Sequence, residues 1–359
     1  MAESEEIGKM SDTDSYGPEI EEGSLVSVKK LVAFVFVGVV VYLLVGLYGK
    51  FDMIANAITS IPWYWVIPAM MGLSFLNYVI RFGKWQYYLR RIGVHLSHVQ
   101  SFGVFLAGFT LTATPGKIGE AVKGVFINDI DGTPLAKTVP VVVSERVTDL
   151  LAMVIIAVFA FIIGFSGGDQ LLLLLLVGGL ALIGAVVLGH SAFYQKILKR
   201  MTSFGPLKRF QDSCDVIEGT MVRTLSPRPM AVATAVSIPG WFMECLEMWL
   251  LLSLLTGAGL PSLTPSSLLL LAQATFIHAA ASTVGAILVF LPGGLGGYES
   301  FAIYVMEFML GLTAALAGAA TILIRFVTLW FSVIVGFVSA AIVTGATRKR
   351  ERPSKQPFR

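Results

Sequence analysis

The sequence predicts an all-α polytopic membrane protein, and three observations support this fold class. Of the 359 residues, 55% are hydrophobic and only 14% are charged, against about 25% charged in soluble domains. Apolar stretches long enough to cross a bilayer, about 18 residues or more, recur along the chain. Two proline-glycine motifs interrupt these stretches. The composition excludes a water-soluble enzyme, and two cysteines are too few for a disulfide-stapled secreted domain.

Six continuous apolar stretches are expected to form full transmembrane helices. An acidic segment without an apolar run, residues 1–28, precedes the first and is expected to be a disordered tail. The six predicted spans are 31–49, 61–80, 139–165, 171–189, 230–255 and 316–344.

Aromatic and basic residues alternate directly after the second span, in residues 81–91. This pattern is typical of a helix lying at the membrane interface, with its rings at the headgroups and its charges reaching water. A plain solvated connector is the alternative interpretation.

The distribution of Lys and Arg orients the chain. Three segments, 81–98, 190–229 and 346–359, hold 17 of the 26 basic residues, and basic loops stay in the cytoplasm. We therefore expect a multi-pass cell-membrane protein with both termini cytoplasmic, a basic amphipathic loop at 190–229 and a basic tail at 346–359. The net charge of +3 gives no reason to expect a nucleic-acid partner.

This orientation requires two further segments to enter and leave the membrane on the same side. Residues 99–130 must begin and end in the cytoplasm, and residues 266–310 must begin and end outside. We expect two re-entrant helical hairpins, one in each half of a domain spanning residues 29–345, with the halves at about 61–165 and 230–344. Irregular backbone at membrane depth is tolerated only inside protein or along a wet cavity, so each hairpin tip marks a cavity.

The hairpin tips share a motif that breaks a helix. Proline removes an amide donor, and glycine permits the positive φ that a reversal needs. The motif Pro-Gly-x-aliphatic-Gly recurs 177 positions along the chain, each time followed by an acid. Its residues are Pro115, Gly116, Lys117, Gly119 and Glu120 in the first copy, and Pro292, Gly293, Gly294, Gly296 and Glu299 in the second.

The elements around the two motifs run in opposite directions, which predicts an inverted repeat. Broken helices at the centre of such a repeat are typical of transporters that bind substrate near the midplane. The new helix N-termini also suit a phosphate group. The alternative is that both motifs simply kink a helix.

Charged residues within the predicted spans are candidates for function, because charge at bilayer depth is costly. Arg146 and Arg325 are 179 positions apart and are expected to be equivalent residues of the two halves. Two guanidinium groups on one cavity can bind a phosphate by paired hydrogen bonds. Acids that could balance or gate this charge are Glu120, Glu145, Asp149, Glu244, Glu247 and Glu299. Of these, Glu244 and Glu247 could pair with Arg325 or Lys117, or one of them could be a proton site.

A static network of ion pairs is the alternative interpretation of these charges. His278 is expected to be a satisfied buried histidine, with a proton relay as the alternative. No Walker loop, metal-ligand cluster or catalytic triad occurs in the sequence. We therefore expect no cofactor, no metal and no enzymatic activity.

Four stretches resemble the flippase-like family that includes the lysylphosphatidylglycerol synthetase transmembrane region. They are Thr114-Pro-Gly-Lys-Ile-Gly-Glu120, Glu145-Arg-Val-Thr-Asp149, Leu291-Pro-Gly-Gly-Leu-Gly-Gly-Tyr-Glu299 and Arg325-Phe-Val-Thr-Leu-Trp330. The resemblance covers residues 30–345. It implies lipid translocation: of aminoacylated phosphatidylglycerol in bacterial relatives, and alongside polyprenyl-phosphate sugar chemistry in archaeal ones. The sequence resembles a member without the synthetase or a glycosyltransferase domain.

The leading hypothesis is a transporter that moves an anionic lipid or a polyprenyl-phosphate glycolipid between leaflets, with the phosphate held by the intramembrane arginines. One alternative is a proton-coupled solute or ion transporter that uses Glu145, Asp149 or Glu244. The other is a non-transporting membrane partner that recruits a lipid-modifying or glycosyltransferase enzyme through residues 190–229.

Overall fold

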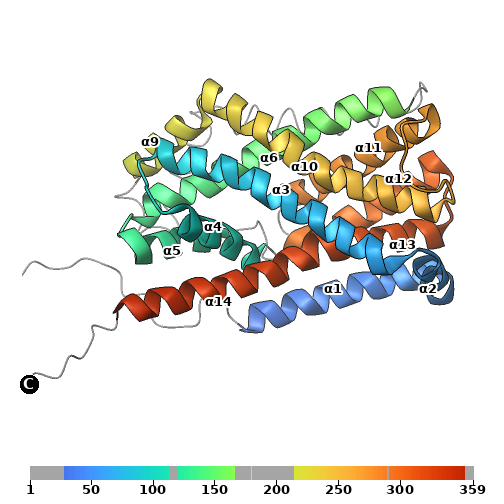
Figure 1. Cartoon of the computed structure of the whole chain (residues 1–359), viewed down its shortest axis with the longest axis horizontal. Helices are drawn as coiled ribbons and strands as arrows, with labels where there is room; N and C mark the ends of the chain where they lie inside the picture. Colours follow the sequence, from blue (N-terminus) through green and yellow to red (C-terminus); the bar gives the residue numbers. More distant parts are fainter. Residues whose placement is uncertain (1–27, 113–119, 166–178, 180–213, 289–290, 352–359) are drawn as a thin grey trace, which may run out of the picture.

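The computed structural model describes residues 28–112, 120–165, 179, 214–288 and 291–351. All regular secondary structure in these residues is helical, which confirms the predicted all-α class (Figure 1). The predicted acidic tail, the predicted span at 171–189 apart from Gly179, and the motif residues Pro115, Gly116, Lys117 and Gly119 lie outside the described residues.

The described helices fall into an N-terminal pair and two series. The pair is α1 (Val28–Gly49) and α2 (Phe51–Ser60). The first series is α3 (Trp63–Arg91), α4 (His98–Ala107), η1 (Gly108–Leu111), α5 (Val122–Asp131) and α6 (Leu135–Gly164). The second is α9 (Cys214–Leu225), α10 (Pro227–Leu255), α11 (Pro265–Ile287), η5 (Pro292–Gly294), α12 (Gly297–Leu310), α13 (Ala314–Arg325), η6 (Phe326–Trp330) and α14 (Phe331–Glu351).

Five helical stretches of the described chain have the length and apolar character of membrane spans, or six if the bent pair α1 and α2 is one span. The bundle presents large apolar side chains outward, among them Phe36, Leu47, Ile163 and Phe308, each more than 60% exposed. Lipid is the environment in which such a surface is stable. The chain is therefore a polytopic membrane protein.

The prediction of an interfacial helix at residues 81–91 is wrong, because these residues continue α3 into the bundle. Lys84 and Trp85 are completely buried, and Arg81 is only 4% exposed. The basic charges are tolerated there because Asp149 of α6 lies 2.8 Å from Arg81 and 2.5 Å from Lys84. Arg81 and Lys84 thus form internal ion pairs, whereas Arg90 and Arg91 at the end of α3 are exposed.

The bend between α1 and α2 is a second feature that the sequence did not predict. The two helices meet at 93°, and Lys50 at the junction has φ of 59°. Positive φ is uncommon for a residue with a side chain. The turn is sharp enough to lay α2 across the end of the bundle, where it packs on α13 (Figure 1).

Both predicted hairpin regions contain a broken helix. In the first, α4 contacts α5, and each has ten residues, or about 15 Å of helix. In the second, α11 contacts α12 across the break at Pro292–Gly294. The two regions differ in the length of their first helix. Helix α11 has 23 residues and is long enough to cross a bilayer by itself, whereas α4 has ten.

Contacts between the two series occur in the matched pairs that an inverted repeat predicts. Helix α11 packs along α6, and correspondingly α4 packs along α14, while α3 packs against α10. In Figure 1, α4 and α5 lie at the left end of the bundle, where α3 ends and α6 begins. Helix α12 and the start of α13 lie at the right end. The helices of the two hairpin regions, α4 with α5 and α12, therefore lie toward opposite ends of the bundle.

Close packing of α14 on η1 depends on a glycine. A Cβ atom added to Gly336 would lie 2.6 Å from the carbonyl carbon of Phe109 and closer still to the Thr110 amide nitrogen. Ser339 Oγ, one turn further along α14, donates to the Gly103 carbonyl at 2.8 Å. This contact joins the last helix of the second series to the first hairpin.

We predict that Gly336→Ala destabilises the detergent-solubilised protein by about 1–3 kcal/mol, because overpacking forces backbone apart. Thermal unfolding measures this as a lower Tm. Gly345→Ala in the same helix is the matched control, since its Cβ would meet nothing within 4 Å, and its Tm should be unchanged or higher. Equal Tm values for both variants would contradict the packing account.

Candidate functional site

A polar cavity lies between the two series of helices. Its volume is about 90 Å³, which is room for several water molecules. The charged and aromatic side chains that line it come from both series. They are Tyr78, Arg81, Glu120, Arg146, Trp241, Glu244, His278, Tyr298 and Arg325.

Each series places on this cavity one arginine that is paired with a glutamate; Glu120 also lines the cavity, whereas Glu299 does not. Arg146 Nη2 lies 3.2 Å from Glu120 Oε2, and Arg325 Nε donates to Glu299 Oε1 at 2.7 Å. Glu120 and Glu299 are 179 positions apart, as are the two arginines. Each glutamate follows a helix break, and each arginine lies on the next long helix. The same ion pair thus occurs once in each series, and the arginines of both pairs line one cavity.

The second break is shaped to hold Arg325. Three glycines there, Gly293, Gly294 and Gly296, have φ of 61°, 69° and 84°, a region that favours glycine. The Gly293 carbonyl accepts a hydrogen bond from Arg325 Nη2 at 2.8 Å. The Gly296 amide donates to Glu299 Oε2 at 2.6 Å. The loop after Pro292 therefore fixes both the arginine and its carboxylate.

A π-helical segment begins directly after Arg325. Residues Phe326–Trp330 form η6 between α13 and α14. Such segments are rare and occur frequently at functional sites. Here the widened turn follows the residue that contacts the break.

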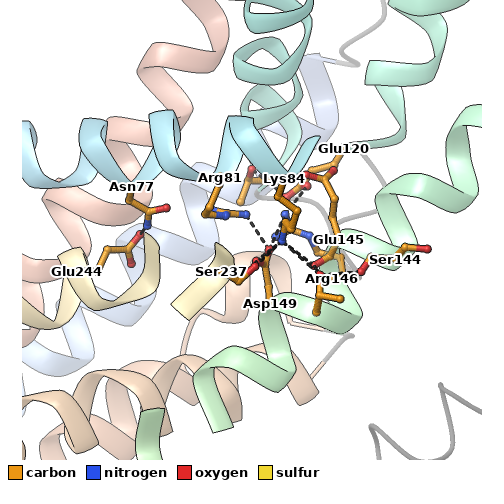
Figure 2. Close-up of polar contacts among 12 residues, drawn as sticks. Asn77, Arg81, Lys84, Glu120, Ser144, Glu145, Arg146, Asp149, Ser237 and Glu244 are labelled. Carbon is orange, nitrogen blue, oxygen red and sulfur yellow. Dashed lines mark hydrogen bonds and ion pairs between the residues drawn. The ribbon is translucent and has the colours of Figure 1, made fainter. Parts of the chain in front are cut away.

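The opposite side of the cavity is more strongly basic. Asp149 of α6 is contacted by Arg81 at 2.8 Å, Lys84 at 2.5 Å and Arg146 at 3.2 Å (Figure 2). Ser237 Oγ of α10 donates to the same carboxylate at 2.9 Å. One acid thus contacts three cations, and Arg146 is shared with Glu120, so these three cations face two carboxylates of the described chain and one positive charge is left over among them.

Neither Glu145 nor Asp149 lines the cavity, although the sequence analysis named both among the acids that could balance or gate charge. Glu145 Oε2 accepts from Lys123 Nζ at 3.0 Å, and both side chains are completely buried. The ammonium also lies 4.9 Å from the centre of the Trp85 ring and 4.8 Å from that of Phe105, close enough for cation–π attraction. Glu145 is a structural partner of this lysine.

Glu244 and Glu247 do not pair with Arg325, whose carboxylate partner is Glu299. They belong to a polar seam between the antiparallel helices α3 and α10. Along this seam Ser74 contacts Glu247, Asn77 contacts Glu244, the Arg81 guanidinium lies over the Trp241 ring and Lys84 contacts Ser237. Figure 2 shows the part of the seam from Asn77 and Glu244 to Lys84 and Ser237.

His278 links this seam to the second ion pair. Its Nε2 lies 3.1 Å from Glu244 Oε2, and its Nδ1 lies 2.9 Å from the Tyr298 hydroxyl. The Arg325 guanidinium lies over the Tyr298 ring, 4.8 Å from its centre. A continuous polar path therefore runs from Glu244 to Arg325.

Arg81, Lys84 and Lys123 are site residues that the sequence analysis missed. The signal for the first two is spacing: Ser74, Asn77, Arg81 and Lys84 recur at intervals of 3, 4 and 3 and share one helix face. Nothing in the sequence distinguishes Lys123 from a solvated base beside a hairpin tip.

The arrangement suits an anion with several oxygens. Three guanidinium groups converge on one enclosed cavity, and guanidinium binds phosphate by two parallel hydrogen bonds. Arg146 is the most accessible of them, with 22% of its side chain exposed. Its Nε atom is buried without a hydrogen-bond acceptor among the described residues. The described residues contain no cluster of three metal-ligating side chains.

We predict that Lys123→Met costs about 3–5 kcal/mol of stability, because it leaves Glu145 buried without its cation. The double variant Lys123→Met/Glu145→Gln should recover most of the loss. Lys137→Met is the control, since Lys137 has no ion pair within the described part of the chain. Unfolding free energies measure the effect, and a double variant no more stable than Lys123→Met would contradict the pairing.

Comparison with known proteins agrees with this architecture. The family model for the lysylphosphatidylglycerol synthase transmembrane region matches residues 31–336 of this chain. A UPF0104 membrane protein of Pyrococcus horikoshii is 24% identical over 293 residues, which cover 74% of this chain and 83% of the relative. The matched range holds both helix breaks and both glutamate–arginine pairs. The chain therefore belongs to the family of the lysylphosphatidylglycerol synthase transmembrane region.

Proposed function

We propose that the protein moves an anionic lipid, a phospholipid or a polyprenyl-phosphate glycolipid, between the two leaflets. The observation that carries the proposal is that the arginines of the two glutamate–arginine pairs line a single cavity at the junction of the two series. The headgroup phosphate occupies the cavity while the hydrocarbon chains remain in the bilayer. The proposal assigns transport and no chemical conversion of the lipid.

The ion pairs give the transport cycle a physical basis. Each arginine is neutralised by a glutamate when the cavity holds no anion, so the empty protein avoids a buried unpaired charge. An entering phosphate competes with Glu120 for Arg146 and with Glu299 for Arg325. Because each pair is fixed to a different helix break, exchange of partners loosens one hairpin or the other. Inverted repeats alternate their access in this way.

The cavity as described is smaller than a lipid headgroup requires, since pockets for small molecules have about 300–1,000 Å³. We propose that the observed arrangement is the closed state, in which Glu120 contacts Arg146 and the second break contacts Arg325. Opening on one side then requires one hairpin, α4 with α5 or α11 with α12, to move relative to the long helix behind it.

We propose a cytoplasmic position for the end of the bundle that carries the basic segments. The end of α3, the start of α9 and the end of α14 all lie at the left end in Figure 1. Basic segments beside membrane spans are retained in the cytoplasm. The first hairpin then opens to the cytoplasm and the second to the outside of the cell membrane.

We predict that Arg146→Ala and Arg325→Ala each slow lipid translocation about tenfold or more, because a hydrogen bond to a charged group contributes about 1.5–3 kcal/mol. The measurement is dithionite bleaching of fluorescent phosphatidylglycerol in liposomes reconstituted with the full chain. Arg223→Ala, an exposed change on α9, is the matched control and should translocate at the parent rate.

Two further measurements make this test specific. Arg146→Lys keeps the charge but loses the paired geometry, so its rate should fall between those of the parent and Arg146→Ala. Thermal unfolding of each variant identifies loss of fold. Folded Arg146→Ala and Arg325→Ala proteins that both move lipid at the parent rate would refute the phosphate-binding role.

A further inference from the structure

Buried charge is distributed unequally between the two sides of the cavity. On the first side every acid that has been described contacts at least one lysine or arginine. On the second side Arg325 is paired with Glu299. Glu244 and Glu247 remain, and neither lies within 4.0 Å of a lysine or arginine in the described part of the chain. An ionised carboxylate buried without a cation is strongly unfavourable.

Hydrogen bonding around Glu247 indicates that a proton neutralises its carboxylate. The Ser74 hydroxyl lies 2.9 Å from Glu247 Oε1 and 3.0 Å from the Val327 carbonyl oxygen. A hydroxyl has a single proton to donate. Both contacts are full hydrogen bonds if Glu247 carries a proton and donates it to Ser74, which in turn donates to Val327. Glu247 is completely buried, and its Oε2 has no hydrogen-bond donor among the described residues.

Glu244 connects this buried acid to the cavity. It lies one helical turn from Glu247 on α10 and lines the cavity itself. Asn77 donates to its Oε1, and His278 Nε2 lies 3.1 Å from its Oε2. Ser282 Oγ is 3.5 Å from the same imidazole nitrogen. Glu244 and His278 can therefore share a proton at a position that water in the cavity can reach.

Groups on each neighbouring helix surround Glu244. Helix α3 presents Tyr78 and Arg81, α11 presents His278, α12 presents Tyr298 and α13 presents Arg325, all of them lining the same cavity. Asp149 of α6 accepts a hydrogen bond from Ser237, which lies two turns away from Glu244 on α10. Arg81 and Arg325 are occupied by Asp149 and Glu299, so they do not neutralise Glu244.

We propose that Glu244, His278 and Glu247 form a proton-binding site whose occupancy is coupled to that of the anion in the cavity. The inference rests on the proposed function and adds its energy source. A phosphate entering beside an ionised Glu244 is repelled, whereas a proton on the Glu244–His278 pair removes the repulsion. Proton and anion therefore bind together and move in the same direction, so a proton gradient drives translocation.

The geometry favours a proton over a metal cation at this site. Asn77 and His278 each contact one oxygen of Glu244 directly by a hydrogen bond, so both carboxylate oxygens already have a protein partner. Hard cations such as Ca²⁺ and Mg²⁺ require six or more oxygen ligands. Imidazole in direct contact with the carboxylate instead provides a second group that accepts a proton.

The first test looks for the proton in the absence of lipid. Infrared difference spectroscopy of the full chain in detergent at neutral pH should show the C=O band of a protonated carboxyl group. Glu247→Gln should remove this band, and Asp215→Asn, an exposed change on α9, should keep it. Absence of the band from the parent protein would overturn the proton site.

The second test measures coupling, with fluorescent phosphatidylglycerol in liposomes that hold a pH-sensitive dye. In the parent, a pH gradient imposed across the membrane should accelerate translocation several-fold toward the alkaline side, and lipid movement should acidify that side. Glu244→Gln should remove the response to the gradient, and Asp215→Asn should retain it.

The outcomes separate the two proposals. Translocation by the parent that ignores the pH gradient overturns the proton coupling while the proposed function stands. A parent protein that moves no lipid at any pH overturns the proposed function and the coupling with it. The infrared band then still decides whether Glu247 carries a proton.

Discussion

An arginine inside an apolar bundle needs a carboxylate beside it, and this requirement organises the protein. Charge at bilayer depth is costly, so Arg146 and Arg325 are each placed against a glutamate that is itself buried. The helix breaks supply those glutamates. In the second break, the Gly293 carbonyl also accepts from the arginine. The irregular backbone is thus stabilised by the same contacts that hold the charge, which explains how it persists away from water.

The two sides of the cavity share this pair but differ in everything around it. The first side adds Arg81 and Lys84 to Asp149 and so carries surplus positive charge. The second adds Glu244 and Glu247 without a lysine or arginine partner in the described chain. Over the described residues the two sides therefore differ in charge: lysine and arginine outnumber the acids on the first, whereas the second carries two buried acids without such a partner.

The sequence predicted the fold class, most of the spans and the position of the second break, because hydropathy and the proline-glycine motif report them directly. It also predicted that Arg146 and Arg325 are equivalent. It failed for Arg81 and Lys84, because a base after an apolar run resembles the end of a span, whereas Asp149 on another helix keeps these bases inside. The partners of Glu145, Glu244 and Glu247 depend on helix rotation and packing, which one sequence does not specify. The 93° bend at Lys50 has no proline or glycine motif of the kind that marks the other breaks.

The central claim is that the paired arginines bind the phosphate of an anionic lipid, and native mass spectrometry of the purified protein tests it most directly. The account predicts that anionic phospholipid or polyprenyl-phosphate lipid remains bound to the parent protein. The same lipid should be lost from the folded double variant Arg146→Ala/Arg325→Ala. Equal retention by both proteins, or retention of uncharged lipid alone, would contradict the account.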